Sequence, residues 1–448
     1  MTNPRVAFVP IARQTFDIEF ARQNSDSARE QVRQLPLEVV GPADLVTDQE
    51  SAEILADSLS KNPPDLLVIF QATFADSSML MSLIARLDAP ILLWAVPENH
   101  TGGRLRLNSL CGINLAAHAL TRAGYQYQHI YTHPDDPAAL SKITTLAKAG
   151  RARNALRTAR VGRIGENPDG FETCLSDPDH LRETFGLELV QFDLINEFFP
   201  LTDQIKADNI TSIEQDLTHR VTGIEQLDSQ AVRKTLGSYA ALKQLAQEKD
   251  LHGFALRCWP EFFTQKGCAA CGAVSMLSDE MIPSSCETDV NGTITQLILQ
   301  SISHEPAFGT DIVSLDEERD ALVVWHCGNA PLSMADPEAP VGTTIHSNRK
   351  LPLLFEFTLK PGPVTIARLT ESTGDYRLVL GRGEIIRGPK SFSGTSGLLK
   401  FSRPARDVLD TILSEGLEHH ISLTYGDHIE VLTSFAQLEG IEILHLTQ

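Results

Sequence analysis

The sequence has no run of about eighteen uninterrupted apolar residues, which is the length that a membrane-spanning helix needs. Basic residues are also scarce, because 38 Lys and Arg stand against 58 Asp and Glu and give a net charge of -20 at pH 7. Binding to nucleic-acid phosphates or to anionic lipid requires clustered cations. We therefore expect neither a nucleic acid nor a membrane as a partner.

Two further absences concern the compartment. The segment Met1-Thr-Asn-Pro-Arg leads directly into a predicted strand and lacks the long apolar region of a signal peptide. The 7 cysteines are odd in number and have no disulfide-framework spacing, which favours a reducing compartment. Cys268 and Cys271 form a single C-x-x-C without a second pair, so tight loop packing is favoured over half a zinc site or a redox pair. These features predict a cytoplasmic protein.

The first part of the chain alternates between strand and helix patterns. Short apolar runs at residues 6–10, 66–70 and 91–96 are typical of buried parallel strands, with helical spacing between them. This order predicts an N-terminal α/β domain over residues 1–153. No G-x-G-x-x-G follows any predicted strand, which argues against a nicotinamide-dependent oxidoreductase.

Two further domains are predicted. A second α/β domain is predicted over residues 154–335. In it, Asp177 and Gly186 are typical of the N-terminal and C-terminal caps of one helix. From about Leu351 the apolar period becomes two, which predicts a β-rich, antiparallel and barrel-like domain over residues 336–448. The expected fold is α/β, with two Rossmann-like or flavodoxin-like domains followed by this β-rich domain.

The densest polar cluster in apolar surroundings is Cys286-Glu287-Thr288-Asp289-Val290-Asn291-Gly292. Apolar residues at helical spacing follow it, so Glu287 lies at or just before a helix N-terminus, where the helix dipole favours an ionised carboxylate. Asp311 follows 24 residues later at the start of a predicted strand. Taken alone, Glu287 could serve only as a helix cap and Asp311 only as a turn residue.

The pair His419-His420 precedes an apolar strand pattern. Strand alternation places His419 with Ile421 on the apolar face and His420 with Ser422 on the polar face. We therefore expect His420 to reach a polar site and His419 to be a packed core histidine. Two carboxylates and one imidazole would suit Mn²⁺, Mg²⁺ or Co²⁺ better than structural zinc.

Other polar residues are candidates for substrate contacts or for an additional metal ligand. Each also has a purely structural interpretation, as a surface loop residue, a solvated arginine or a satisfied core histidine. They are Trp259 and Glu261 in one predicted cleft wall, Arg13 after the first strand, His326 at the end of a buried strand, and His346.

Three segments together resemble the superfamily of L-fucose isomerase and L-arabinose isomerase, of the fucose isomerase-like type. CETDVNGTITQLILQSISHEPAFGTDIV is similar to the family's acidic helix and second acidic residue, GPVTIARLTESTGDYRLVLGRGE to an arabinose isomerase segment, and GLEHHISLTYGDHIEVLTSFAQLEGIEI to its His-His strand. The resemblance implies that Glu287 and Asp311 are the metal-binding catalytic carboxylates and that His420 is the histidine ligand. Arabinose isomerases use a further histidine, a place that His346 could take by its order in the chain, with His326 as the competitor.

The implied activity is metal-dependent aldose–ketose isomerisation of an open-chain sugar through a cis-enediol, with Mn²⁺ as the expected cofactor and Mg²⁺ or Co²⁺ as alternatives. The resemblance also implies a homo-oligomer, a trimer or hexamer. One alternative is an isomerase for an anionic sugar such as a sulfosugar, which would need pocket arginines; Arg13, Arg257 and Arg349 are the candidates. The other is a non-catalytic sugar-binding relative, which would not need an intact metal-ready site.

Overall fold

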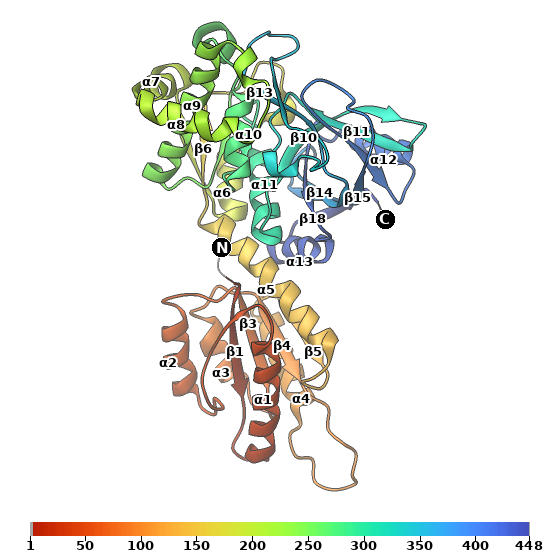
Figure 1. Cartoon of the computed structure of the whole chain (residues 1–448). Coiled ribbons are helices and arrows are strands. Elements are labelled where there is room, and N and C mark those ends of the chain that lie inside the picture. The colour runs from red at the N-terminus through yellow and green to blue at the C-terminus, as the bar shows by residue number, and fades with distance from the viewer. Residues whose placement is uncertain (1–2, 448) are drawn as a thin grey trace. The chain divides into compact units, whose positions relative to one another are not determined.

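The computed structural model describes residues 3–447. The chain divides into two compact units, Met1–Asn154 and Ala155–Gln448, which the colour bar of Figure 1 distinguishes by residue number. The predicted middle and C-terminal domains both lie in the second unit, where residues such as Leu242 and Leu399 belong to one hydrophobic core. The division into three domains stays a prediction.

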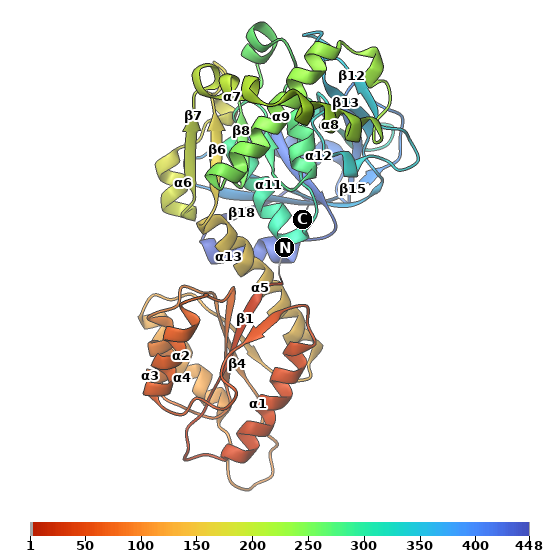
Figure 2. The ribbon, with the colours of Figure 1, turned by 60° about the vertical axis from the view of Figure 1, so that its left-hand side comes forward.

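The N-terminal unit is built on a five-stranded sheet in the order β2-β1-β3-β4-β5, and all its strand pairs are parallel. Successive residues of β1 point to opposite faces, so Val6 and Phe8 belong to one core and Ala7 and Val9 to the other. Both cores are covered by helices, α1 and α5 on one face and α2, α3 and α4 on the other (Figure 2). The elements are β1 (Arg5–Ile11), α1 (Ile18–Arg33), β2 (Glu38–Val40), α2 (Gln49–Leu59), β3 (Leu66–Gln71), α3 (Ser78–Ile84), β4 (Ile91–Ala95), α4 (Ser109–Arg122), β5 (Gln128–Tyr131) and α5 (Pro137–Arg157).

The second unit begins with a smaller parallel sheet in the order β7-β6-β8-β9. The predicted caps of its first α-helix are present, because the Asp177 side chain accepts backbone N–H bonds at the start and Gly186 adopts a left-handed conformation at the end. The elements are β6 (Arg160–Ile164), α6 (Pro178–Phe185), β7 (Glu188–Phe192), α7 (Phe199–Gln204), α8 (Ala207–Thr218), α9 (Ser229–Lys249), β8 (Gly253–Leu256), α10 (Cys271–Asp279), β9 (Ser284–Ser285) and α11 (Val290–Ser303).

A closed antiparallel barrel of six strands follows, in the order β10-β11-β16-β15-β14-β17, with β17 pairing back to β10. Strands β10 and β11 precede residue 335 and nevertheless belong to the barrel, so the barrel begins earlier than the predicted β-rich domain. The elements are β10 (Phe308–Asp316), β11 (Ala321–His326), β12 (Gly342–Thr344), β13 (Leu354–Thr358), β14 (Gly362–Thr370), β15 (Arg377–Ile386), β16 (Thr395–Phe401), α12 (Ala405–Ser414), β17 (His420–Tyr425), α13 (Ile429–Glu439) and β18 (Glu442–His445).

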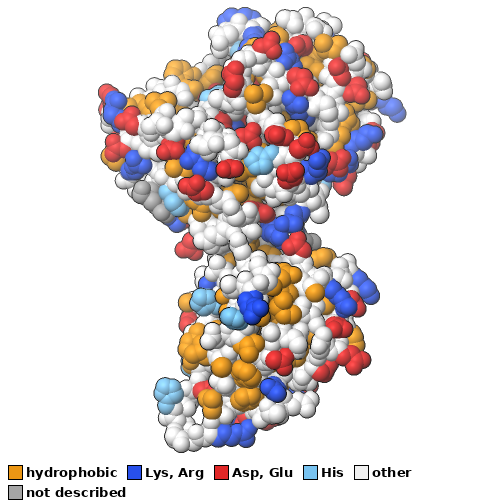
Figure 3. Space-filling model, turned by 180° about the vertical axis from the view of Figure 1, so that it is seen from behind, with side chains coloured by type: hydrophobic (Ala, Val, Ile, Leu, Met, Phe, Trp, Pro, Cys, Tyr) orange, Lys and Arg blue, Asp and Glu red, His pale blue; other side chains and the backbone are white. Residues whose placement is uncertain are grey.

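These findings confirm a mixed α/β chain with parallel sheets and a C-terminal antiparallel barrel. The assignment of the α/β parts as Rossmann-like or flavodoxin-like domains stays a prediction. Within residues 3–447, no helix combines the length and the apolar character needed to cross a membrane. On the face seen in Figure 3, acidic and basic side chains are interspersed over each unit, so the negative charge is not gathered there into one patch.

Candidate metal and acid–base site

The segment before α11 adopts an uncommon backbone conformation. Glu287 and Thr288 have φ angles of 61° and 58°, a left-handed region that non-glycine residues rarely adopt. The Asn167 side-chain amide donates to the carbonyl oxygens of both residues, at 3.1 Å each. The helix cap is Asp289, whose Oδ1 accepts from the backbone N–H of Gly292 at 2.9 Å. Glu287 is therefore not the cap, and its carboxylate is directed to other partners.

His420 is the meeting point of three carboxylates from separate segments. Its Nε2 lies 3.8 Å from Glu287 Oε2 and 3.4 Å from Asp311 Oδ1, and its Nδ1 lies 3.0 Å from Asp289 Oδ2. The approach of Asp311 follows from the sheet register, since Asp311 on β10 is paired directly with His420 on β17. The structure thus brings the predicted Glu287, Asp311 and His420 together.

A buried arginine stands behind this histidine. Arg368 and Asp289 are both 1% exposed, and Arg368 Nη1 donates to Asp289 Oδ2 at 2.6 Å. Burial opposes ionisation of Asp289, but Arg368 and His420 outweigh it and hold the pKa of that carboxyl below its ordinary value. In the neutral tautomer in which His420 Nδ1 donates to Asp289, the Nε2 lone pair faces Glu287 and Asp311.

Sequence reasoning did not assign a role to Asp289 or Arg368. Asp289 stands in the polar cluster around Glu287, and Arg368 stands in the segment that resembles arabinose isomerase. An arginine in the middle of a strand pattern that is otherwise largely apolar was the available signal. Asp289 lies 79 residues earlier, inside the polar cluster, but nothing in the sequence linked it to Arg368.

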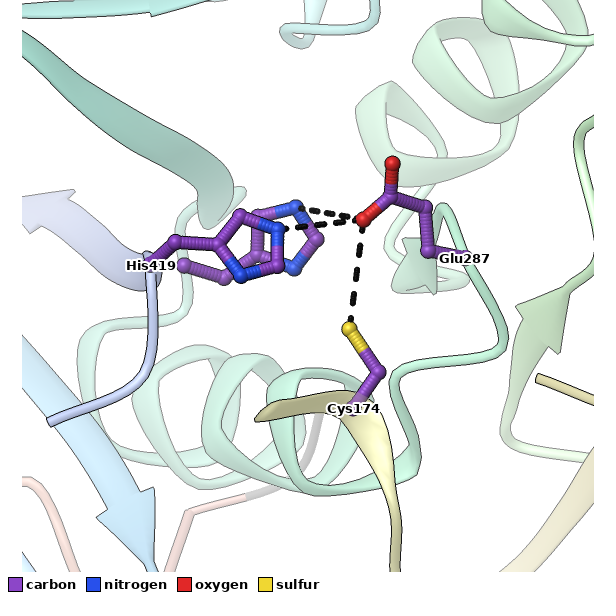
Figure 4. Close-up of side chains that lie close together, drawn as sticks. Cys174, Glu287 and His419 are labelled. Atoms are coloured by element: carbon purple, nitrogen blue, oxygen red, sulfur yellow. Dashed lines mark hydrogen bonds and ion pairs between the residues drawn. The ribbon is translucent and has the colours of Figure 1, made fainter. Parts of the chain in front are cut away.

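His419 differs from its prediction. Its side chain is 38% exposed, its Nε2 lies 3.0 Å from Glu287 Oε2, and its Nδ1 lies 2.7 Å from the hydroxyl of Thr173. The prediction of a packed core histidine is wrong because β17 begins at His420, so strand alternation does not extend to His419. Figure 4 shows His419 and Cys174 directed at the same carboxylate oxygen of Glu287.

The charge state of His419 follows from these contacts. Burial alone would lower the pKa of His419, but the hydrogen bond to Glu287 and the charge of Asp311 outweigh it and raise the pKa above its ordinary value. His419 is thus a hydrogen-bond donor to Glu287 and lies at the more exposed side of the site.

His326 lies beside the site. One of its ring nitrogens lies within 4.8 Å of a carboxylate oxygen of Asp311 and of a ring nitrogen of His420. The rings of His326 and His420 stack with their centroids 5.6 Å apart. Nδ1 of His326 accepts the backbone N–H of Cys327 at 2.8 Å, so in the neutral ring Nε2 carries the proton. This tautomer favours hydrogen-bond donation over metal ligation.

The remaining candidates are placed differently. Trp259 Nε1 donates to Glu287 Oε1 at 3.1 Å. Among the residues that the structure describes, two groups of side chains have ligand atoms within 4.8 Å of one another: Cys174, Glu287, His419 and His420 form one, and Asp311, His326 and His420 form the other. Glu261 belongs to neither group and makes a two-pronged ion pair with Arg257, at 2.8 and 3.0 Å. His346 is also outside those groups. Arg13 belongs to the N-terminal unit, where its backbone N–H donates to Thr73.

Cys268 and Cys271 of the C-x-x-C motif do not form a disulfide bond. All seven are free thiols. Cys271 Sγ lies 3.1 Å from Cys327 Sγ, and Cys268 is buried in the core, so the side-chain partner of Cys271 comes from the loop after β11.

One carboxylate oxygen, Asp311 Oδ1, indicates what kind of ligand the site can bind. Asp311 Oδ1 is enclosed, and no group among residues 3–447 donates a hydrogen bond to it. An enclosed carboxylate oxygen without a partner is costly. His420 Nε2 lies near both Asp311 Oδ1 and Glu287 Oε2, and the Glu287 oxygen also accepts a hydrogen bond from His419. Such a donor set fits a divalent cation bound by oxygen and imidazole ligands.

Comparison with known proteins agrees with the implied family. Residues 7–157 match the model of the fucose/sulfoquinovose isomerase N-terminal domain, and residues 324–446 match that of the L-fucose isomerase C-terminal domain. Sulfoquinovose isomerase of Priestia aryabhattai is 31% identical over 444 residues, covering 99% of both chains. Sulfoquinovose isomerase of Alkalicoccus urumqiensis is 30% identical, covering 98% of this chain and 99% of the relative.

A more distant relative is the L-arabinose isomerase of Aeromonas hydrophila subsp. hydrophila, which is 20% identical and covers 92% of this chain and 86% of its own. The full-length relatives and both domain models carry sugar isomerase names. The chain therefore belongs to the fucose isomerase-like family, and it is an aldose–ketose sugar isomerase.

Proposed function

We propose that the chain isomerises sulfoquinovose to the corresponding ketose at a divalent metal site formed by Glu287, Asp311 and His420. The observation that carries the site is the enclosed Asp311 Oδ1, which has no hydrogen-bond donor and lies 3.4 Å from His420 Nε2. The substrate rests on the relatives named sulfoquinovose isomerase, which match this chain over nearly its whole length. Mn²⁺ is the proposed metal.

The two carboxylates form the acid–base pair of the proposed mechanism. One of them removes the proton from C2 of the open-chain aldose, the hydroxyl proton moves from O2 to O1, and a proton is returned to C1 through a cis-enediol. A bound divalent cation supplies Lewis-acid polarisation of the carbonyl group. His419 and Trp259 hold the Glu287 carboxylate by hydrogen bonds at 3.0 and 3.1 Å. The protonated Nε2 of His326 donates a hydrogen bond to a substrate oxygen.

Removal of the metal tests this function directly. Chelation with EDTA followed by dialysis is expected to abolish conversion of sulfoquinovose to ketose. Added Mn²⁺ is expected to restore this conversion, because the ligand atoms all come from this chain. The measurement is ketose formation followed by NMR, with the wild type and His420→Gln at equal Mn²⁺ concentration. His420→Gln should not recover. Full activity of demonstrably metal-free wild type would contradict the proposal.

Asp289 is proposed to be a positioning residue for His420. Asp289→Asn is expected to weaken the apparent Mn²⁺ affinity by about 10- to 100-fold, because the carboxylate no longer fixes the imidazole tautomer. Mn²⁺ titration of activity measures this affinity, and the melting temperature without metal is recorded separately because Asp289 also pairs with Arg368. A lower melting temperature with unchanged Mn²⁺ affinity would show that Asp289 acts only through stability.

A further inference from the structure

A cationic and aromatic cluster lies beside the site, formed by Trp259, Phe263, His346 and Arg349. The guanidinium carbon of Arg349 lies 4.6 Å from the Trp259 ring centre and 5.3 Å from the Phe263 ring centre. At its edge, the Trp259 ring donates a hydrogen bond from Nε1 to Glu287. One indole ring therefore separates this guanidinium from a carboxylate of the proposed catalytic pair.

The tautomer of His346 is set by the backbone. Its Nδ1 accepts the backbone N–H groups of Asn348 and Arg349, at 3.2 Å each, so the neutral ring carries its proton on Nε2. That Nε2 lies 3.2 Å from Nη1 of Arg349. In this tautomer two N–H donors face each other without an acceptor between them, whereas in the other tautomer Nε2 accepts a hydrogen bond from Arg349. The His346 ring is 6% exposed and packs edge-on against Phe263, so this donor is held in place.

Arg349 also differs from the other arginines around the site. Arg257 is neutralised by Glu261, and Arg368 is neutralised by Asp289. Within the described part of the chain, no ion pair joins a carboxylate to Arg349, and its guanidinium carbon lies over the Trp259 and Phe263 rings. An unneutralised guanidinium that lies over aromatic rings, next to a second N–H donor, is suited to an oxyanion with several acceptor oxygens.

We propose that Arg349 and His346 bind the sulfonate group of the substrate, an inference that rests on the proposed function. A sulfonate has three acceptor oxygens and no proton at neutral pH, so it can accept from both donors at once. Sulfoquinovose carries this group on C6, and an extended six-carbon chain with a terminal sulfur spans about 7 Å at ordinary single-bond lengths. In the proposed binding mode, C1 and C2 lie at Glu287 and Asp311 and the sulfonate lies at Arg349, with the Trp259 ring beside the sugar.

The test compares two sugars that differ only in the sulfonate, sulfoquinovose and 6-deoxyglucose. Arg349→Met keeps an apolar stem against Trp259 and removes the charge. We expect its KM for sulfoquinovose to rise by about 10- to 100-fold with little change in kcat, because a charge-assisted hydrogen bond to the bound substrate is lost. Activity on 6-deoxyglucose should stay at the wild-type level. Arg349→Lys should be intermediate, and Arg406→Met, which alters an exposed arginine on α12, should match the wild type with both sugars.

The outcomes separate this inference from the proposed function. Wild type that isomerises neutral aldoses and leaves sulfoquinovose unchanged would overturn the proposed substrate and the sulfonate site with it. Wild type that isomerises sulfoquinovose while Arg349→Met keeps the same KM would overturn the sulfonate site alone. An equal loss with both sugars would show that Arg349 only supports Trp259, and it would also overturn the sulfonate site.

Discussion

Replacing Glu287 with Gln is expected to lower kcat for sulfoquinovose by about 10³- to 10⁴-fold. Glutamine has nearly the same shape and can still accept the Trp259 Nε1–H bond, but its amide cannot take up a proton as a carboxylate does. The loss should appear in kcat, measured with saturating Mn²⁺, and the melting temperature should change little.

The control for this variant is Glu317→Gln. Glu317 is an exposed carboxylate that pairs with Arg406 on the surface, so its replacement removes the same charge without touching the site. Its kcat should equal that of the wild type. Turnover of Glu287→Gln at the wild-type rate would show that Glu287 is not part of the acid–base pair.

Replacing Arg368 with Met is expected to lower the free energy of unfolding by about 3–5 kcal/mol. The substitution leaves Asp289 and Glu418 as buried carboxylates without their cation, and breaking a buried ion pair on one side costs far more than a surface pair contributes. Urea unfolding followed by circular dichroism, in the absence of divalent metal, measures the change.

Arg382→Met provides the matched comparison. Arg382 is 45% exposed and pairs with Asp427 at the surface, so its loss should cost about 0–1 kcal/mol. If Arg368→Met proved no more destabilising than Arg382→Met, the buried network would not be a source of stability. Arg368→Lys keeps the charge and loses the planar guanidinium with its fork of donors. Its loss of unfolding free energy should fall between those of the two Met variants, and it can be measured if Arg368→Met does not fold.

The sequence predicted those parts of the fold that depend on local patterns. The apolar run at residues 66–70 became a fully buried parallel strand, and Asp177 and Gly186 cap their helix as expected. The residue at which the barrel begins was harder to predict from the sequence, since β10 and β11 belong to the barrel only through pairing with strands far along the chain. Periodicity marks a strand but does not specify its partner.

The candidate site divides in the same way. Glu287, Asp311 and His420 were predicted from their spacing, from strand alternation and from the family resemblance, and the structure places them together. The left-handed backbone at Glu287 could not be predicted, because non-glycine residues adopt it only where the surrounding structure holds them there. His419 was mispredicted because β17 begins one residue later, at His420, so strand alternation does not determine the direction of the His419 side chain.

The pairing of Asp311 with His420 also has a consequence for how the enzyme forms. The two residues are 109 positions apart, and they become neighbours only when β10 and β17 join. Contacts between such distant segments carry a large loop-closure cost and are formed slowly. Strand pairs of the N-terminal sheet join residues at most about 60 positions apart, as with Val6 and Leu66, so this sheet can be complete before the barrel closes. A refolding chain is therefore expected to have native-like helices while it is still inactive, and isomerase activity then reports barrel closure.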